Sequence, residues 1–173
     1  MNQLWAPWRM TYIAGIGNKD EGCIFCAKQK ESDDRKNLIL WRGKMCFVIM
    51  NLFPYNNGHL MVVPNAHAAD IDALDKNTSG ELWDLVCLSR KALTEAFHPD
   101  GFNIGINLGR TAGAGIDTHL HAHIVPRWNG DTNFMPVLGE TKVISQALHE
   151  TYDALLPYFR STTGSSSAAP SSR

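Results

Sequence analysis

Three histidines alternate with apolar residues in the stretch 119–128, which reads HLHAHIVPRW. Strict alternation is typical of a half-buried β-strand, because successive side chains of a strand point to opposite faces of the sheet. The alternation predicts that the apolar residues face the core, namely Leu120, Ala122 and Ile124. We expect His119, His121 and His123 to line the opposite, exposed face. Three imidazoles on one strand face are difficult to explain by packing alone, so we interpret this face as a functional site.

Two kinds of chemistry use such a row of imidazoles. Neutral imidazole is the commonest metal ligand among side chains, and two histidines separated by one residue can share an ion. Alternatively, one imidazole attacks a substrate as a nucleophile, while its neighbours orient it and bind the charged group under attack. An unperturbed imidazole titrates near pH ~6.5, so a neutral, nucleophilic form is present at cellular pH. The histidines alone leave both interpretations open.

The cysteines form a second chemical feature. Cys23 and Cys26 make a CxxC pair, whereas Cys46 and Cys87 sit in apolar surroundings and are expected to be core thiols. No thioredoxin-like pattern surrounds the pair, which favours a metal site over a redox pair; two reduced cysteines in a loop are the alternative. A closed tetrahedral site needs two more ligands, for which His67 and one of the three histidines are candidates.

Composition limits the class of protein. The chain has 173 residues, a hydrophobic fraction of 44% and a formal net charge of -1. These values fit one domain with a substantial core and do not suggest an electrostatic nucleic-acid binder. Residues 1–17 contain no uninterrupted apolar run, so we expect neither a signal peptide nor a membrane span, and a cytoplasmic location.

The elements that must position these side chains are predicted from periodicity and turn residues. Strand-like segments are Lys44–Met50, His59–Val63, Phe102–Asn107 and the histidine strand itself. Thr78 and Glu81 form a capping-box pattern that starts a helix ending before Pro99, and a second helix is expected over about Lys142–Leu156. The core stripe of the first helix is predicted to be Leu82, Trp83, Val86, Leu93, Ala96 and Phe97. The predicted class is α+β, an antiparallel sheet with two helices packed beside it.

The ends of the chain differ from this body in composition. Residues 1–17 are aromatic enough to form an arm that packs on the body or on a second subunit. Residues 161–173 consist almost entirely of Ser, Thr, Ala, Gly and Pro and are expected to be disordered. We therefore predict a single domain over residues 1–160, including the arm, followed by a disordered tail.

Two further features are compatible with phosphate binding. Glycines of the segment Gly109–Gly115 allow backbone N–H groups to approach phosphate oxygens, although such loops also serve as simple strand connectors. The loop is not a Walker motif, because no Gly-Lys-Ser/Thr follows it. Arg127, at the end of the histidine strand, suits a bidentate phosphate contact and equally suits an ordinary surface position.

Three separated motifs in residues 23–143 resemble the HIT (histidine triad) superfamily. They are the His-x-His-x-His run, the CxxC pair, and the pattern Asn51-x-x-Pro54-x-x-x-Gly58-His59-x-x-Val62-x-Pro64. The continuation PRWNGDTNF over residues 126–134 is similar to the bacterial branch that includes diadenosine tetraphosphate phosphorylases. The resemblance implies a HIT-like fold and a covalent nucleotidyl-histidine intermediate, formed when His121 attacks the α-phosphorus of a nucleotide.

The resemblance also implies roles for other residues. Asn51 is expected to hold the ribose hydroxyls, and the nucleotide-binding set around it and the phosphate is expected to comprise Phe47, Leu52, His59, Gly113, Gly115, Ile116 and Arg127. Protonated His123, Asn107 and the backbone of Gly113–Ile116 are expected to stabilise charge on the α-phosphate. Asn107 lies one residue further from the triad than in the hydrolase branch, and Gly115 replaces the glutamine of many HIT hydrolases. These departures are expected to change how the loop treats the acceptor of the nucleotidyl group, which is phosphate in phosphorylases and water in hydrolases.

In the zinc-carrying branch of the superfamily, the ligands correspond by position to Cys23, Cys26, His67 and His119. Such a closed zinc site is structural and leaves two triad histidines for chemistry. No metal is needed at phosphorus, although a magnesium–nucleotide substrate is compatible with the scheme. The resemblance further implies a homodimer formed through the long helix and the sheet.

The sequence is therefore compatible with four functions. The leading hypothesis is a phosphorylase that converts a dinucleoside polyphosphate and phosphate to ADP and ATP. The alternatives are a HIT-type hydrolase that uses water, a hydrolase in which the triad holds a catalytic metal, and a nucleotide-binding module without turnover.

Overall fold

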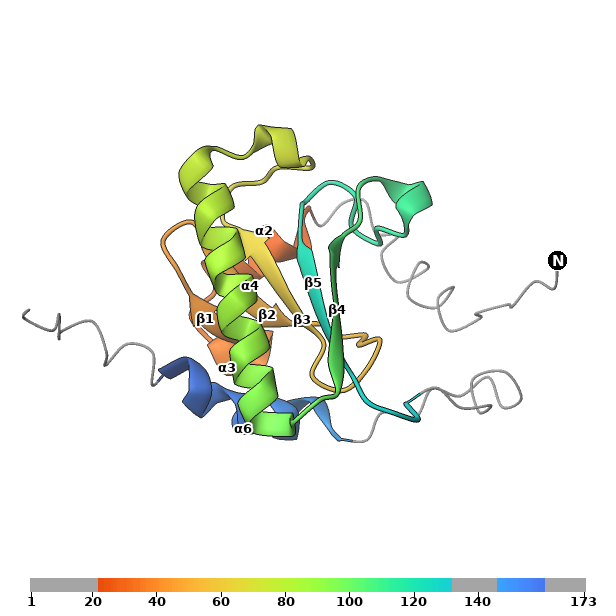
Figure 1. Cartoon of the computed structure of the whole chain (residues 1–173). Coiled ribbons are helices and arrows are strands. Elements are labelled where there is room, and N and C mark those ends of the chain that lie inside the picture. The colour runs from red at the N-terminus through yellow and green to blue at the C-terminus, as the bar shows by residue number, and fades with distance from the viewer. Residues whose placement is uncertain (1–21, 132–145, 161–173) are drawn as a thin grey trace, which may run out of the picture.

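The structure is a computed structural model that describes residues 22–131 and 146–160 (Figure 1). The predicted aromatic arm, the start of the second predicted helix at 142–145 and the predicted disordered tail lie outside the described residues. The strands are β1 (Ile39–Arg42), β2 (Cys46–Met50), β3 (Leu60–Pro64), β4 (Gly101–Ile106) and β5 (Ala122–Arg127). They form one sheet in the order β1-β2-β3-β5-β4, with every neighbouring pair antiparallel.

Two helices cover one face of this sheet, as predicted for an α+β protein. The two are α4 (Lys76–Phe97) and α6 (Leu148–Arg160). The described chain also contains the short helices α2 (Ile24–Lys30) and α3 (Asp34–Asn37) and the 3-10 turns η1 (Ile71–Ala73) and η2 (Arg110–Ala112). The long helix α4 runs across the sheet, and α6 packs beside it (Figure 1). No helix within the described ranges is both long and apolar enough to cross a membrane.

The larger core lies between the sheet and these two helices. Alternate residues of the strands reach it, including Val48, Val62 and the three apolar triad neighbours. Those neighbours are Leu120, Ala122 and Ile124, all 3% exposed or less, so their predicted core orientation is confirmed. The helices contribute Leu82, Leu85, Val86, Leu93, Leu155 and Phe159.

A smaller cluster covers part of the opposite face. Phe25, from α2, packs there against Phe47, Ile49, Met61 and Val63. Met61 is paired with His123, so the histidines lie on this second face. The prediction that this face is exposed is wrong, because His119, His121 and His123 are only 1%, 5% and 8% exposed. A short helix that no periodicity signal indicated brings an aromatic ring over them.

Helix α4 begins two residues before the predicted cap. Asp75 is the N-cap: its Oδ1 accepts hydrogen bonds from the backbone N–H groups of Asn77 and Thr78. The predicted capping box is therefore wrong. Glu81 instead accepts from the backbone N–H groups of Met45 and Cys46, and so ties α4 to the start of β2.

Two residues of α4 predicted to be buried point outward. Trp83 is 54% exposed, and Cys87 is also exposed, whereas Cys46 is buried as expected. The apolar stripe of α4 includes Leu85, and Trp83 lies to one side of it. The outer face of α4 therefore carries a large aromatic side chain that no core packing explains.

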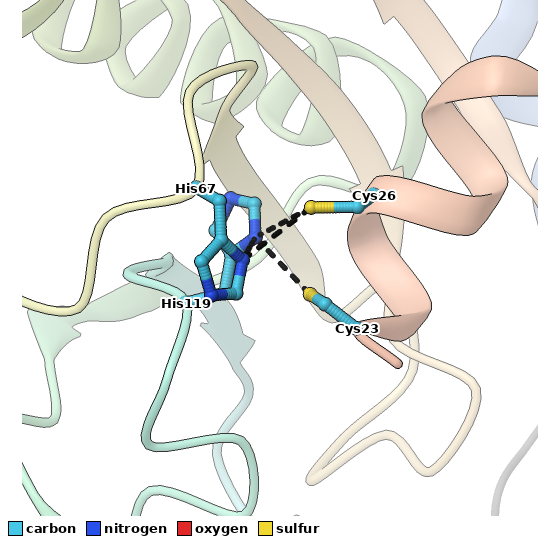
Figure 2. Close-up of side chains that lie close together, drawn as sticks. All are labelled: Cys23, Cys26, His67 and His119. Atoms are coloured by element: carbon cyan, nitrogen blue, oxygen red, sulfur yellow. Dashed lines mark hydrogen bonds between the residues drawn. The ribbon is translucent and has the colours of Figure 1, made fainter. Parts of the chain in front are cut away.

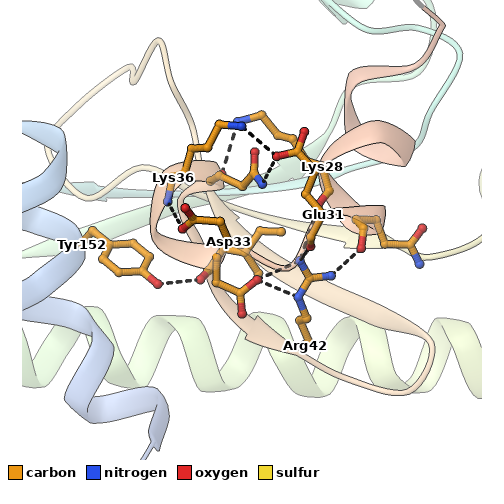
Figure 3. Close-up of polar contacts among 10 residues, drawn as sticks. Lys28, Glu31, Asp33, Lys36, Arg42 and Tyr152 are labelled. Atoms are coloured by element: carbon orange, nitrogen blue, oxygen red, sulfur yellow. Dashed lines mark hydrogen bonds and ion pairs between the residues drawn. The ribbon is translucent and has the colours of Figure 1, made fainter.

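A polar network links α2, which carries the CxxC pair at its N-terminus, to α3 and β1 (Figure 3). Arg42 of β1 donates from Nη1 to the Gln29 carbonyl oxygen (2.6 Å) and from Nη2 to the Glu31 carbonyl oxygen (2.7 Å). Its Nε donates to Asp34 Oδ1 at 2.8 Å. These bonds satisfy carbonyls at the C-terminal end of α2, which the helix itself leaves without partners. One arginine thus fastens α2 to the sheet.

Candidate active site

The CxxC pair and two histidines converge at one end of the sheet. Cys23 caps the N-terminus of α2 and Cys26 lies in its first turn, while His67 follows β3 and His119 precedes β5. Figure 2 shows both sulfur atoms directed at the two imidazole rings. The four candidate ligand atoms all lie within 4.8 Å of one another. The structure thus brings together the four residues that the resemblance assigned to zinc.

The spacing of these atoms suits a tetrahedral metal. Cys23 Sγ lies 3.2 Å from His119 Nδ1, and Cys26 Sγ lies 3.4 Å from His67 Nδ1. The two Nδ1 atoms are 3.2 Å apart. A tetrahedral zinc with ordinary Zn–S and Zn–N bonds places its ligands about 3.3–3.8 Å apart. The Cys2His2 donor set therefore suits zinc, its atoms need only shifts of up to about an ångström to reach this spacing, and four protein ligands leave no coordination position open for substrate.

Backbone carbonyls determine which nitrogen the first two triad imidazoles offer. His119 donates from Nε2 to the Pro64 carbonyl oxygen at 2.9 Å, which leaves Nδ1 facing the cysteines. His121 donates from Nδ1 to the His119 carbonyl oxygen at 2.8 Å. The neutral His121 ring therefore carries its lone pair on Nε2. Burial also lowers the pKa of His121, which favours this neutral form.

His123 receives its orientation from His59, which is only 1% exposed. The backbone N–H of Tyr55 donates to His59 Nδ1 at 3.0 Å, so that nitrogen is the acceptor. His59 Nε2–H then donates to His123 Nδ1 at 2.9 Å. By the same logic His123 carries its proton on Nε2. The order of donors makes His123 Nε2–H a hydrogen-bond donor of fixed orientation.

That last nitrogen has no hydrogen-bond partner among the described residues, although it is buried. A buried polar atom without a partner is uncommon and indicates a place for a ligand group. In the ligand-free chain, burial and the neighbouring His121 lower the pKa of His123 to about 4, so the ring is neutral there. Protonated His123 beside a bound α-phosphate stays a prediction. The ring still donates a hydrogen bond, but it does so as a neutral imidazole.

The triad histidines do not share one ion. His119 faces the cysteines, His121 bonds a backbone carbonyl, and His123 bonds His59. Over residues 22–131 and 146–160, the one group suited to a metal is the Cys2His2 cluster. The geometry therefore favours the nucleophile interpretation of His121 over a catalytic metal held by the triad.

The segment before the triad approaches the same place. The ladder between β4 and β5 ends at the pair Ile106–Ala122, so Asn107 leaves it opposite His121. Gly109 and Gly113 have φ of +76° and +97°, values that favour glycine and turn the chain back toward β5. Ile116 packs against the cluster around Phe25. Gly115 lies between Gly113 and Ile116, in the loop that leads to the triad.

The loop that joins β2 to β3 contains three of the predicted nucleotide contacts, namely Asn51, Leu52 and His59. Asn51 accepts from the Phe53 backbone N–H at 3.0 Å, and its Nδ2 lies 3.3 Å from His59 Nδ1. Leu52 is 51% exposed at the surface, whereas Phe47 is 1% exposed inside the smaller cluster. The structure thus places Asn51 beside His59 and leaves Leu52 accessible to a base, while Phe47 is part of the core.

Arg127 lies away from the other predicted site residues. It ends β5, four residues beyond His123, which corresponds to ~13 Å along a strand. Its guanidinium donates to Asp131 at 2.7 and 2.8 Å and to Asn103 at 2.8 Å. The guanidinium nitrogens of Arg127 that were expected to bind phosphate therefore bond Asp131 and Asn103 instead.

Phe25 is a site residue that sequence reasoning missed. Its ring lies 5.4 Å from that of His119 and 5.2 Å from that of His121, measured between centroids. The available signal was its position inside the CxxC motif, where an aromatic residue shares a helix turn with the metal ligands. Phe25 thereby links the candidate metal site to the candidate nucleophile.

Comparisons with known proteins agree with this arrangement. A family model described as HIT domain matches residues 32–130. An AP-4-A phosphorylase from Mycobacterium tuberculosis strain H37Rv is 37% identical over 157 residues, which cover 87% of this chain and 80% of that protein. An adenosine 5'-monophosphoramidase from Schizosaccharomyces pombe is 32% identical over 107 residues, covering 62% of this chain and 75% of that protein.

Solved structures share the fold. A Zn-bound histidine triad family protein from Mycobacterium smegmatis superposes with a TM-score of 0.66 at 24% identity, covering 83% of this chain and 96% of that one. A histidine triad nucleotide-binding protein from Sulfolobus tokodaii gives a TM-score of 0.62 at 27% identity, covering 82% and 92%. The predicted fold is confirmed by these likenesses.

Proposed function

Because this chain belongs to the HIT domain family, we propose that it is a nucleotidyltransferase that splits diadenosine tetraphosphate, or a related dinucleoside polyphosphate, with phosphate as acceptor. The products are ADP and ATP. The observation that carries this proposal is the pairing of two ring nitrogens. His121 offers a lone pair on Nε2, while His123 offers a buried Nε2–H that has no partner among the described residues.

In the first step, His121 Nε2 attacks the α-phosphorus of one adenylate unit. The Nε2–P bond forms, the bridging P–O bond breaks, and ATP leaves with the electrons of that bond. His123 Nε2–H donates to an α-phosphate oxygen, and Asn107, the first residue after β4, is proposed to bind the same group. These groups stabilise the charge that develops on the phosphoryl oxygens.

In the second step, an oxygen of inorganic phosphate attacks the same phosphorus. The new P–O bond forms ADP, and the Nε2–P bond breaks so that its electrons return to His121. An imidazole is a good leaving group, which allows the intermediate to turn over. The relative named AP-4-A phosphorylase supports phosphate rather than water as acceptor, and a hydrolase remains the alternative outcome of the test.

We further propose that Cys23, Cys26, His67 and His119 hold one structural zinc ion. Zinc would supply no chemistry at phosphorus, because its four positions are filled by protein. Its proposed role is to fix the backbone carbonyl of His119, which orients His121. Magnesium belongs to this proposal only as a possible component of the polyphosphate substrate.

We also propose that the protein is a homodimer joined through β4 and α4. Within the described part of the chain, β4 pairs only with β5, so its outer edge is open to a second strand. Ile104 on this strand is 40% exposed, Leu108 beyond it 41%, and Trp83 on α4 54%. Pairing of two copies at this edge would cover apolar side chains that the single chain leaves in solvent.

The test is to incubate the protein with diadenosine tetraphosphate, with and without inorganic phosphate, and to separate the nucleotides by ion-exchange chromatography. Phosphate-dependent formation of ADP and ATP supports the phosphorylase. AMP and ATP formed without phosphate identify a hydrolase, and tight AMP binding without turnover identifies a binding module.

The covalent step is tested separately by acid quenching and intact-protein mass spectrometry. An adenylyl adduct is expected on the unsubstituted protein when phosphate is withheld, and none on His121→Asn. His149→Asn is the matched control, because His149 is exposed on α6. Full activity in His121→Asn would remove His121 from the mechanism.

A further inference from the structure

The orientation of His123 depends on a loop that lies outside its own strand. Two N–H groups of the loop approach His59 Nδ1: the Tyr55 backbone amide at 3.0 Å and Asn51 Nδ2 at 3.3 Å. Only while Nδ1 accepts does His59 keep its proton on Nε2, where it bonds His123. The position of the loop backbone therefore decides which tautomer each of these two histidines adopts.

Tyr55 contributes its ring as well as its amide. The ring centroid lies 4.6 Å from that of His59 and 5.8 Å from that of His123, nearly parallel to the latter at 25°. The aromatic ring thus covers the hydrogen bond between the two imidazoles. Both contributions depend on Tyr55 staying close to His59.

Asn56, the next residue, anchors this part of the loop to the end of β5. Its Nδ2 donates to Asp131 Oδ2 at 2.7 Å and to the Pro126 carbonyl oxygen at 3.1 Å. Its own carbonyl accepts from the His59 backbone N–H at 3.2 Å, which closes the turn. Asn56 is therefore held through both its side chain and its backbone carbonyl, which also holds the neighbouring Tyr55 in place.

Asp131 is the centre of that anchor. Its side chain is only 10% exposed, and it accepts from Arg127 Nε and Nη2 at 2.7 and 2.8 Å. It also accepts from the Trp128 backbone N–H at 3.1 Å, in addition to Asn56. Several charge-assisted bonds on one carboxylate make it a rigid point of attachment. This explains physically why Arg127 and Asp131 occur together in the motif that follows the triad.

We infer that Asp131 is a positioning residue for His123, acting through Asn56, Tyr55 and His59. The inference rests on the proposed function for its catalytic meaning, but the tautomers of His59 and His123 test it independently of turnover. Asp131 itself touches neither imidazole.

The experiment compares Asp131→Asn with the unsubstituted full chain. An asparagine of the same shape has no charge and only one acceptor oxygen. If that oxygen takes the place of Oδ2, its NH2 group faces Arg127 Nη2, which it cannot accept from, and the bonds to Arg127 Nε and Asn56 lose their charge assistance. Long-range proton–nitrogen correlation spectra of the histidine side chains report each tautomer. We expect single Nε2–H tautomers for His59 and His123 in the unsubstituted protein and tautomer mixtures in Asp131→Asn. We expect kcat to fall on the order of tenfold, with KM for the dinucleotide within about twofold.

Two further variants keep the test decisive. Asn56→Ala breaks the same link while leaving the Arg127–Asp131 pair intact, and it should reproduce the mixed tautomers even if Asp131→Asn fails to fold. Asp153→Asn is the matched control, because Asp153 also pairs with an arginine, Arg35, but on the exposed surface of α6. The control should leave both tautomers unchanged.

Unchanged tautomers of His59 and His123 in folded Asn56→Ala, and in folded Asp131→Asn, would overturn the inference whatever the activity. Absence of turnover in the unsubstituted protein would instead refute the proposed function, while the spectra would still decide the role of Asp131. The two failures are thus distinguishable.

Discussion

The triad imidazoles are chemically different, although they share one residue type and one short segment. His119 offers Nδ1 because its other nitrogen bonds the Pro64 carbonyl, and His121 offers Nε2 because its Nδ1 bonds the His119 carbonyl. His123 offers an N–H rather than a lone pair, because His59 donates to its Nδ1. Hydrogen bonds to the second nitrogen thus leave one ring facing the cysteines, one with a lone pair for the proposed attack, and one with an N–H to donate.

Burial of these imidazoles makes stability depend on pH. The folded pKa of His123 is about 4, below the ordinary value of 6.5, so between these values the unfolded chain binds a proton that the folded chain does not. The free energy of unfolding is therefore unaffected by this group above pH ~6.5 and falls as the pH drops toward ~4, by at most ~3.5 kcal/mol. Burial shifts the pKa values of His119 and His121 in the same direction.

Urea unfolding of metal-stripped protein at a series of pH values between 4 and 7 measures this dependence. His123→Gln should flatten the slope, because it removes one of the titrating groups. His149→Gln, an exposed change on α6, should leave the slope as it is. Equal slopes for all three proteins would contradict the assignment.

At the scale of elements, α2 and its N-cap carry the two cysteines of the proposed zinc site. We expect one zinc per chain, and we expect Cys26→Ser to lose it and to unfold at lower temperature, because a Cys2His2 site contributes directly to folding energy. Elemental analysis and scanning calorimetry, with and without a chelator, measure both effects. Cys87→Ser is the matched control, since Cys87 is exposed on α4. Retention of zinc by Cys26→Ser would argue against the ligand set.

Arg42 is expected to matter to α2 more than its surface position suggests. Arg42→Ala removes the donors to the α2 carbonyls and the ion pair with Asp34. Because these acceptors are exposed and can bond water instead, the cost in unfolding free energy is ~1–2 kcal/mol. Urea denaturation measures this loss, and a chelator competition assay should show weaker zinc binding. Arg35→Ala breaks only an exposed pair with Asp153 and should cost less than ~1 kcal/mol. Similar losses of unfolding free energy for both variants would show that the bonds from Arg42 to the α2 carbonyls stabilise the fold no more than an exposed ion pair does.

Much of this arrangement could be predicted from the sequence because its signals are local. The alternation in 119–124 indicated both the strand and its core-facing residues, and the CxxC spacing indicated the paired sulfur ligands. Resemblance then indicated that His67 and His119 join the two cysteines, as the structure shows, whereas the role of His121 as nucleophile stays a prediction. Each of these signals is carried by residue types only a few positions apart.

What escaped prediction depends on contacts between distant segments. The histidine face is buried because Phe25 of α2 folds over it, a contact across almost a hundred residues that no periodicity encodes. The link between Asn56 and Asp131 is equally non-local. Even the α4 cap was misplaced, because Asp75 and Thr78 are both good capping residues and Glu81 is used by β2 instead.

At the scale of the whole molecule, the open edge of β4 and the exposed face of α4 make a prediction about assembly. Ile104→Lys places a charge on an apolar side chain of the edge strand and should convert a dimer to a monomer, because a charged edge disfavours strand pairing. Light scattering coupled to size-exclusion chromatography measures the mass of each. Ile71→Lys is the control, since Ile71 is also exposed but lies in η1 rather than on β4. A monomeric unsubstituted protein would refute the proposed dimer.

The convergence of Cys26, His67 and His119 also has a consequence for the kinetics of folding. Bonds to one ion would join positions 41, 52 and 93 residues apart in the chain. Such long loops are costly to close in an unfolded chain, so the complete ligand set assembles only after β3 and β5 have paired. An ion that engages its last ligand late stabilises the native state more than the transition state. The proposed zinc would therefore chiefly slow unfolding, lengthening the lifetime of the folded chain without speeding its formation.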